Sequence, residues 1–203
     1  GYPRNDIFFK EQLDDYDLIE ADTKSIAKIN VFRNNSCKVI LYAPTCGDPV
    51  GNAVKMNFLN LSRLSEFAGH NNLVFVFKFH PNVRCEKEFG LFDRIIYYDN
   101  TKDIQPLLKL SDILVTDYSS VYMDYLLLDR PIIFFPYNYV QYMQSQNGLL
   151  FEYDSMTPGP KCFSQEQLEH ELVLCRTNND CFAVQRHKIR QISFKYVDGN
   201  ASE

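Results

Sequence analysis

Five polar residues of this sequence stand directly after apolar segments, where they could bind a phosphate group. In chain order they are Thr45, Lys78, His80, Ser119 and Ser120. Lysine supplies a point charge, and histidine can donate to a phosphate oxygen or transfer a proton. Serine and threonine hydroxyls, with the free backbone N–H groups that open a helix, also bind anions. These residue types predict a site for a phosphorylated ligand.

The segment Ser111-Asp112 through Ser120 carries the strongest of these signals. An apolar run ends at Thr116, and Asp117-Tyr118-Ser119-Ser120 then opens a predicted helix. A pyrophosphate would fit the N–H groups and hydroxyls at that point. The alternative is that Ser119 or Ser120 only caps the helix, and the residues favour neither interpretation. Asp117 could cap the turn, bind a ribose or orient His80.

Lys78 and His80 are two residues apart, so in an extended strand their side chains point to the same side. Both could therefore face one ligand, with Pro81 ending the strand. The alternative interpretation is an exposed strand end with an incidental histidine. The pairing with a lysine favours a functional role for His80.

The bulk composition is that of one soluble globular domain. Of the 203 residues 45% are hydrophobic and 23% are charged, the net charge is −5, and no dense run of Lys and Arg occurs. Nucleic-acid binding is therefore not predicted. No membrane-spanning run, C-x-x-C pair, phosphate-binding P-loop or H-E-x-x-H helix is present, so no metal or cofactor is predicted, although a magnesium requirement stays open.

Short apolar runs alternate with segments of helical periodicity. The predicted strands are 38–43, 73–79, 94–98, 113–116 and 131–135; the predicted helices are about 52–69, 104–110 (capped by Asp103), 121–128, and the region after 164 with a break near 177–179. Apolar strands joined by helices predict an α/β fold with a doubly wound parallel sheet, whose ligands bind beyond the carboxyl ends of the strands. Arg130 is expected to lie in solvent.

Several motifs occurring in order resemble those of the CDP-glycerol glycerophosphotransferase family, the teichoic-acid and capsule polymerases. They are Gly1–Asp6, Leu41–Thr45, Lys78–Pro81, Ser111–Ser120, Asp124-Tyr125, Arg130–Phe135, Pro158-Gly159-Pro160 and Asp198–Glu203. The resemblance covers nearly the whole chain, and its specificity comes from several motifs in register. Because the chain starts with Gly1 and not with Met, we expect it to be a piece of a longer protein.

The resemblance implies a GT-B architecture, in which two Rossmann-like domains enclose the active site. Residues 1–203 would be the C-terminal, donor-binding domain. Residues 1–36 would be a lead-in from the missing N-terminal domain, with one short helix, and 164–203 would be C-terminal helices. His80 would act on the donor phosphate, and Asp117 to Ser120 would lie at the pyrophosphate, whereas a second histidine, the base, belongs to the missing domain.

The implied reaction transfers glycerol phosphate, or a related polyol phosphate, from a CDP-activated donor to a lipid-linked polymer at the cytoplasmic face of a bacterial membrane. Lys78 and Thr45 would help to hold the donor, and Arg4, Pro158 and Gly159 are candidate loop contacts. The sequence departs from the family pattern at Cys46-Gly47 and Asn147, where a cation is common. The alternatives are a nucleotide-sugar glycosyltransferase, which would prefer another nucleotide, and a nucleotide-binding domain without turnover.

Overall fold

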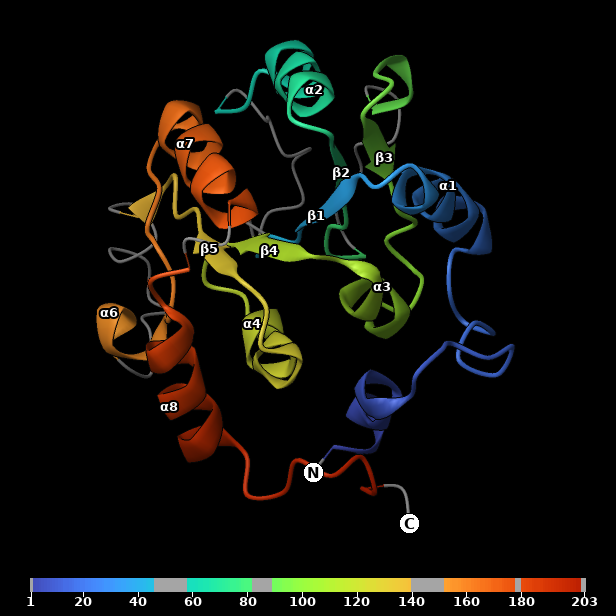
Figure 1. Cartoon of the computed structure of the whole chain (residues 1–203), viewed down its shortest axis with the longest axis vertical. Coiled ribbons are helices and arrows are strands. Elements are labelled where there is room, and N and C mark those ends of the chain that lie inside the picture. The colour runs from blue at the N-terminus through green and yellow to red at the C-terminus, as the bar shows by residue number, and fades with distance from the viewer. Residues whose placement is uncertain (1, 46–57, 82–88, 140–151, 178–179, 202–203) are drawn as a thin grey trace.

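The protein is built on a five-stranded parallel sheet, seen in the computed structural model, which describes residues 2–45, 58–81, 89–139, 152–177 and 180–201 (Figure 1). The strands are β1 Lys38–Tyr42, β2 Leu73–Phe77, β3 Ile95–Tyr97, β4 Ile113–Thr116 and β5 Ile132–Phe134. Their order across the sheet is β3-β2-β1-β4-β5, and every neighbouring pair is parallel. The order reverses between β1 and β4, which is where such sheets bind ligands.

Helices cover both faces of the sheet. They are α1 Thr23–Asn34, α2 Leu61–His70, α3 Gln105–Leu110, α4 Val121–Tyr125, α6 Tyr153–Met156, α7 Gln165–Arg176 and α8 Ala183–Ser193, with short 3-10 helices η1 Pro3–Phe9, η2 Phe89–Leu91 and η3 Leu126–Leu128. Side-chain oxygens fix three of the helix starts, because Asp22, Asn60 and Ser164 each accept a backbone N–H of the first turn.

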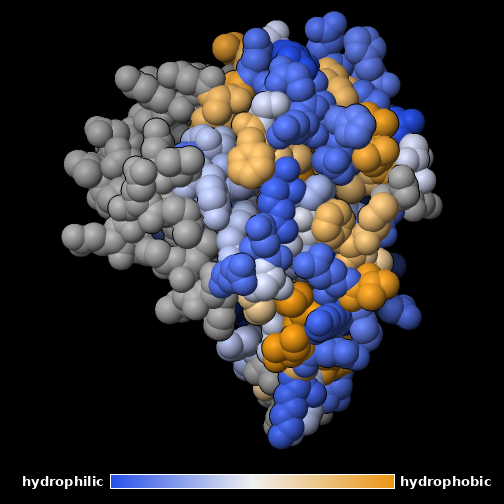
Figure 2. All heavy atoms as spheres, turned by 90° about the vertical axis from the view of Figure 1, so that its left-hand side faces the viewer, coloured by the Kyte–Doolittle hydropathy of each residue, from blue (hydrophilic) through white to orange (hydrophobic). Residues whose placement is uncertain are grey.

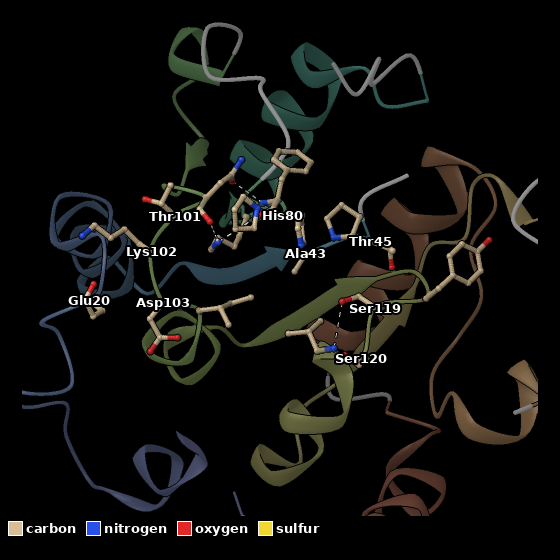
Figure 3. Close-up of a pocket in the computed structure, with 17 residues that line it drawn as sticks. Glu20, Ala43, Thr45, His80, Thr101, Lys102, Asp103, Ser119 and Ser120 are labelled. Carbon is tan, nitrogen blue, oxygen red and sulfur yellow. Dashed lines mark hydrogen bonds between the residues drawn. The ribbon is translucent and has the colours of Figure 1, made fainter. Parts of the chain in front are cut away.

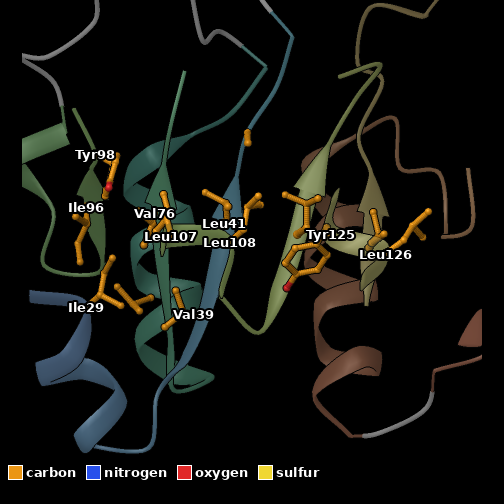
Figure 4. Packing of buried hydrophobic residues seen from close by; sticks show 14 of the residues in the cluster. Ile29, Val39, Leu41, Val76, Ile96, Tyr98, Leu107, Leu108, Tyr125 and Leu126 are labelled. Atoms are coloured by element: carbon orange, nitrogen blue, oxygen red, sulfur yellow. The ribbon is translucent and has the colours of Figure 1, made fainter. Parts of the chain in front are cut away.

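The apolar strands divide their side chains between two cores. Val39 and Leu41 of β1 point to one face, where they pack with residues of α1 and α3 (Figure 4). Ile40 and Tyr42 point to the other face, towards α2 and α7. Both sets are almost fully buried. Alternate side chains of one strand are therefore shielded by different helices, which explains the continuous apolar runs.

The predicted strands agree with the observed ones to within two residues at each end. The predicted helix over 52–69 is wrong at its start, because Asn60 is the N-cap of α2; residues 52–57 lie outside the described part. The N-cap of α3 is Ile104 and not Asp103 as predicted, although the Asp103 carboxylate lies one residue earlier and accepts Gln105 N at 3.2 Å. The helix over 121–128 is divided into α4 and η3.

Residues 1–36 hold more structure than the one short helix predicted. They contain both η1 and the 12-residue α1, whose Ile26 and Ile29 are buried against the sheet. η1 also contacts the C-terminal tail, because Ala201 N donates to Asp6 at 3.1 Å. Figure 1 accordingly shows the two ends of the chain side by side.

No helix within the described residues is long and apolar enough to cross a membrane. On the face seen in Figure 2, apolar side chains are interspersed with hydrophilic ones. This mixture is usual for the surface of a globular protein.

Candidate functional site

A pocket of about 890 Å³ opens at the carboxyl ends of β1, β2 and β4 (Figure 3). Five of the residues predicted to bind a ligand line it, namely Thr45, Lys78, His80, Ser119 and Ser120. They come from three segments that are far apart in the sequence and meet because parallel strands end at the same edge of the sheet. The pocket lies at the point where the strand order reverses, as the sequence predicts.

Lys78 is a buried cation held by main-chain oxygens. It lies just after β2, and its Nζ donates to Asn100 O at 2.8 Å and to Phe79 O at 3.3 Å. An ammonium group has three donors, so one remains for a ligand in the pocket. Burial lowers the pKa of Lys78, and the nearby carboxylates of Asp99 and Asp103 oppose that shift. His80 is exposed at the same pocket.

The two serines differ in their local contacts. Ser119 Oγ accepts Val121 N at 3.4 Å, which is a weak form of the predicted capping contact. Ser120 occupies the N-cap position of α4, yet its side chain makes no capping hydrogen bond. Ser120 is also exposed and lines the pocket. Ser119 only accepts in this contact, so the O–H groups of both serines can still donate to a ligand in the pocket.

Asp117 ties together the loops that follow β1 and β4. Its Oδ1 accepts Thr45 N and Thr45 Oγ1 at 2.7 Å each, Tyr118 N at 2.6 Å and Ser119 N at 3.2 Å. Only 3% of its surface is exposed. Burial raises the pKa of Asp117, and these hydrogen bonds oppose the shift. The geometry favours the structural role of Asp117, a clamp beneath the pocket, over contact with a ribose.

Asn100, which sequence reasoning missed, fixes the segment that carries Lys78 and His80. It follows β3, is buried, and its Oδ1 accepts Phe79 N at 3.0 Å while its backbone oxygen holds Lys78. Nothing in the sequence distinguishes this asparagine from its polar neighbours, since its role depends on the pairing of β2 with β3. Glu20, Thr101 and Asp103 line the same side of the pocket.

Three candidate contacts lie outside this pocket. Arg4 forms an ion pair with Asp124 at 3.0 Å, and Pro158 and Gly159 are buried beside β5. None of the three is among the pocket-lining residues. The family departures at Cys46-Gly47 and Asn147 lie outside the described residues.

Metal ligands and disulfides are not evident in the part of the chain that the structure describes. No group of three or more His, Cys, Asp or Glu side chains there could hold a metal ion. Cys37, Cys162 and Cys175 are free thiols. The chemistry available in the pocket is thus that of fixed hydrogen-bond donors and one buried cation, which suits the charge of a phosphate ester.

Sequence comparison gives matches over the whole chain. Residues 1–203 match the model of a protein family described as CDP-Glycerol:Poly(glycerophosphate) glycerophosphotransferase. The teichoic acid poly(glycerol phosphate) polymerase of Bacillus subtilis (strain 168) is 32% identical over 172 residues, which are 82% of this chain and 22% of that protein. The teichoic acid poly(ribitol-phosphate) polymerase of Bacillus spizizenii is 31% identical over 176 residues, 83% of this chain and 26% of that one.

Comparison with solved structures gives a match to a teichoic acid polymerase as well. A structure of a variant of the wall teichoic acid polymerase TagF, soaked with CDPG, has a TM-score of 0.70 and 27% identity, over 100% of this chain and 47% of that one. The chain therefore spans only about half of this solved structure, and about a quarter of the two sequence relatives.

Proposed function

Because this chain belongs to the CDP-glycerol:poly(glycerophosphate) glycerophosphotransferase family, we propose that it forms the donor-binding part of an enzyme that transfers a polyol phosphate during teichoic-acid-like polymer synthesis. The donor would be CDP-glycerol or a related CDP-polyol. The observation that carries the proposal is the meeting of Lys78, His80 and Ser120 in one pocket at the strand ends.

The proposed reaction is a displacement at phosphorus. An acceptor hydroxyl oxygen attacks the phosphorus that bears the glycerol, a new P–O bond forms, and the P–O bond of the pyrophosphate bridge breaks. CMP leaves with the electron pair, and the hydroxyl proton passes to a base. Negative charge spreads over the phosphoryl oxygens in the transition state, so fixed donors and cations provide most of the catalysis.

The residues of the pocket would divide this work. Lys78 is fixed by two carbonyl oxygens and would direct its remaining N–H to the pyrophosphate. Ser120 would donate its hydroxyl to the same group, and Thr45 and Ser119 are held next to it through Asp117. His80 would stabilise the transferring or leaving phosphate.

The rest of the enzyme is proposed from the family resemblance. A missing N-terminal domain, completing a GT-B architecture, would supply the base and part of the acceptor site, and the acceptor would be a lipid-linked polymer at the inner face of a bacterial membrane. The fragment alone is then expected to bind donor without releasing CMP. CMP release from CDP-glycerol by the fragment in the presence of a polymer acceptor would contradict this division of labour.

Calorimetric titration with CDP-glycerol, CDP, UDP and GDP tests the donor site. We expect cytidine nucleotides to bind selectively, and His80→Ala and Ser120→Ala each to weaken CDP-glycerol binding about tenfold or more, as loss of a hydrogen bond to a charged group does. Ser155→Ala is the matched control, because Ser155 is an exposed serine that lies outside the pocket. Preference for UDP would favour the glycosyltransferase alternative, and equal effects of all three substitutions would contradict the proposed site.

A further inference from the structure

A second pocket, of about 730 Å³, lies at the opposite end of the sheet and is lined by four cationic residues. They are Lys10, Arg33, Lys109 and Arg130, and the acidic residue in the lining is Glu11. Arg33 lies in the last turn of α1 before β1, Lys109 lies in the last turn of α3 before β4, and Arg130 lies just before β5. The cations therefore gather at the amino ends of strands, whereas the donor pocket lies at the carboxyl ends.

Arg33 and Arg130 are each held to main-chain oxygens by a single side-chain nitrogen, Nη1. Arg130 Nη1 donates to Lys109 O at 2.7 Å and to Ser111 O at 2.5 Å, and Arg33 Nη1 donates to Leu110 O. Arg130 is thus half-buried, not in solvent as the sequence suggested. Within the described residues, Nε and Nη2 of Arg33 make no hydrogen bond, whereas the Arg130 guanidinium also interacts with the hydroxyl of the buried Tyr125. The main chain therefore holds both guanidinium groups in place, and the Nε–Nη2 edge of Arg33 remains for a ligand.

The nearby acids compensate this charge unevenly. Lys10 is paired with Asp14 at 2.9 Å and Asp17 at 2.7 Å, and so its charge is balanced. Arg33 lies 3.9 Å from Asp112, a carboxylate that is also shared with Lys38 and with Val39 N. No ion pair within the described residues involves Lys109 or Arg130. In the described residues, Lys109 and Arg130 are thus the cations of the pocket without a carboxylate at ion-pair distance, although Asp17 also acts on Lys109.

Lys109 bridges the segments that form the pocket. Its Nζ donates to Ile7 O at 2.8 Å and to Lys10 O. Burial lowers the pKa of Lys109; Asp17 opposes this shift, and the neighbouring charges of Arg130 and Lys10 add to it. A bound anion would relieve the repulsion among these cations. An anion with two oxygens in one plane would also match the free guanidinium edge of Arg33.

We propose that this pocket binds a phosphodiester group of the anionic polyol-phosphate polymer, at a site separate from the donor pocket. Each phosphodiester carries one charge and two non-bridging oxygens, which match one guanidinium edge. Gln12, Asn30 and Asn34 also line the pocket and could bind the polyol hydroxyls between phosphates. The choice of polymer rests on the proposed function, whereas the anion site rests on the arginine geometry.

The two pockets are far enough apart to be occupied together. β1 has five residues, and a strand rises about 3.3 Å per residue, so roughly 16 Å of strand separates its two ends. A polymer bound at the amino ends would keep a growing chain attached to the enzyme without blocking the donor.

Titration with a synthetic glycerol-phosphate oligomer, in low and high salt, tests the proposal. We expect Arg33→Gln and Arg130→Lys each to weaken oligomer binding about tenfold to a hundredfold, and high salt to weaken binding to the wild type. Arg176→Gln is the matched control, because Arg176 donates to Asn71 O at 2.6 Å near the end of α7 and does not line the pocket. Unchanged oligomer affinity in folded Arg33→Gln and Arg130→Lys proteins would overturn the proposal.

Further measurements distinguish binding at this pocket from binding at the donor pocket, and the polymer from a phospholipid headgroup. In the wild-type protein, the Nε–H signals of Arg33 and Arg130 in a nuclear magnetic resonance spectrum should shift with the oligomer and not with CDP-glycerol. Oligomer binding that is lost only in His80→Ala or Ser120→Ala would overturn this inference and leave the proposed function intact. Absence of CDP-glycerol binding, with arginine-dependent oligomer binding, would contradict only the donor-site proposal. Binding to phosphatidylglycerol vesicles, without binding to the oligomer, would overturn the polymer assignment.

Discussion

Lys78 shows how one side chain can couple donor binding to pH. Its ammonium is buried next to two carbonyl oxygens, and burial holds its pKa below the ordinary 10.5. The charged form, which attracts a pyrophosphate, is present below the lowered pKa and is lost as pH rises through it. A bound pyrophosphate favours that charged form, so binding in this pH range should take up a proton.

We therefore predict that, as the pH is raised, the affinity for CDP-glycerol begins to fall before pH 10.5 is reached. The Lys78→Arg protein should keep its affinity to a higher pH, because arginine stays protonated. Calorimetric titrations over a pH series, in buffers of different ionisation enthalpy, would measure both the affinity and the proton uptake. The same pH profile in wild type and Lys78→Arg would show that another group titrates.

Asp117 is the residue whose removal should affect stability most directly. Its replacement by alanine leaves the N–H groups of three half-buried residues and the Thr45 hydroxyl without their acceptor. We expect Asp117→Ala to lower the free energy of unfolding by about 2–4 kcal/mol, measured by urea denaturation. Asp117→Asn retains an oxygen acceptor and should cost less than about 1 kcal/mol. Equal losses in both variants would show that the negative charge, not the hydrogen bonds, holds the two loops.

At the scale of single residues, the sequence predicts the residue types of the site better than their individual roles. Thr45, Lys78, His80 and the serines line one pocket because each follows an apolar strand, and that pattern is visible in the sequence. That Ser119 makes the weak capping contact and Ser120 makes none depends on local backbone geometry. The contacts of Asn100 depend on strand pairing, which no local pattern encodes.

At the scale of elements, Gly159 lets the segment after α6 approach β5. A Cβ atom at this position would stand 2.0 Å from Ile132 O, so no side chain fits without moving the backbone. The close approach allows Phe134 N to bond Pro160 O at 2.9 Å, and Cys162 N to bond Phe134 O at 2.8 Å. The Pro-Gly-Pro turn thus serves as an extra edge for the sheet.

We predict that Gly159→Ala lowers the free energy of unfolding by about 3 kcal/mol, because backbone must shift to remove the clash. Gly69→Ala is the control substitution, since a Cβ in α2 at that position meets nothing within 4 Å. It should raise stability by up to about 1 kcal/mol through helix propensity. Urea denaturation of both variants checks the pair, and a neutral Gly159→Ala would mean that the strip beside β5 relaxes freely.

The bounds of a helix or strand were predictable where its sequence shows a clear pattern of apolar residues. All five strands are apolar over nearly their whole length because helices cover both faces, and they were predicted to within two residues at each end. The one short helix expected in residues 1–36 was given no bounds, because only Ser25, Ile26 and Ile29 of the twelve residues of α1 are buried, which leaves a weak periodic pattern. Its position is determined by packing against the sheet, which lies later in the sequence.

At the scale of the whole molecule, the sheet separates two candidate anion sites, with Lys78 at its carboxyl edge and the guanidinium groups of Arg33 and Arg130 at its amino edge. Ligands that bind only the folded state stabilise it by mass action, by about 2.7 kcal/mol for each ligand at one hundred times its Kd. Independent sites should therefore give about 5.4 kcal/mol when CDP-glycerol and the glycerol-phosphate oligomer are both present at that excess.

If the two ligands compete for one site, the expected stabilisation of the fold is smaller. Two ligands at the same excess would then stabilise the fold by only about 3.1 kcal/mol together, because each molecule excludes the other. Urea denaturation with no ligand, each ligand and both would distinguish the two cases. Arg33→Gln should remove the stabilisation by the oligomer and keep the stabilisation by CDP-glycerol. His80→Ala should remove the stabilisation by CDP-glycerol and keep that by the oligomer. Such a double separation would show that the protein holds donor and polymer at opposite ends of one sheet, so that a growing chain can remain bound while donors are exchanged.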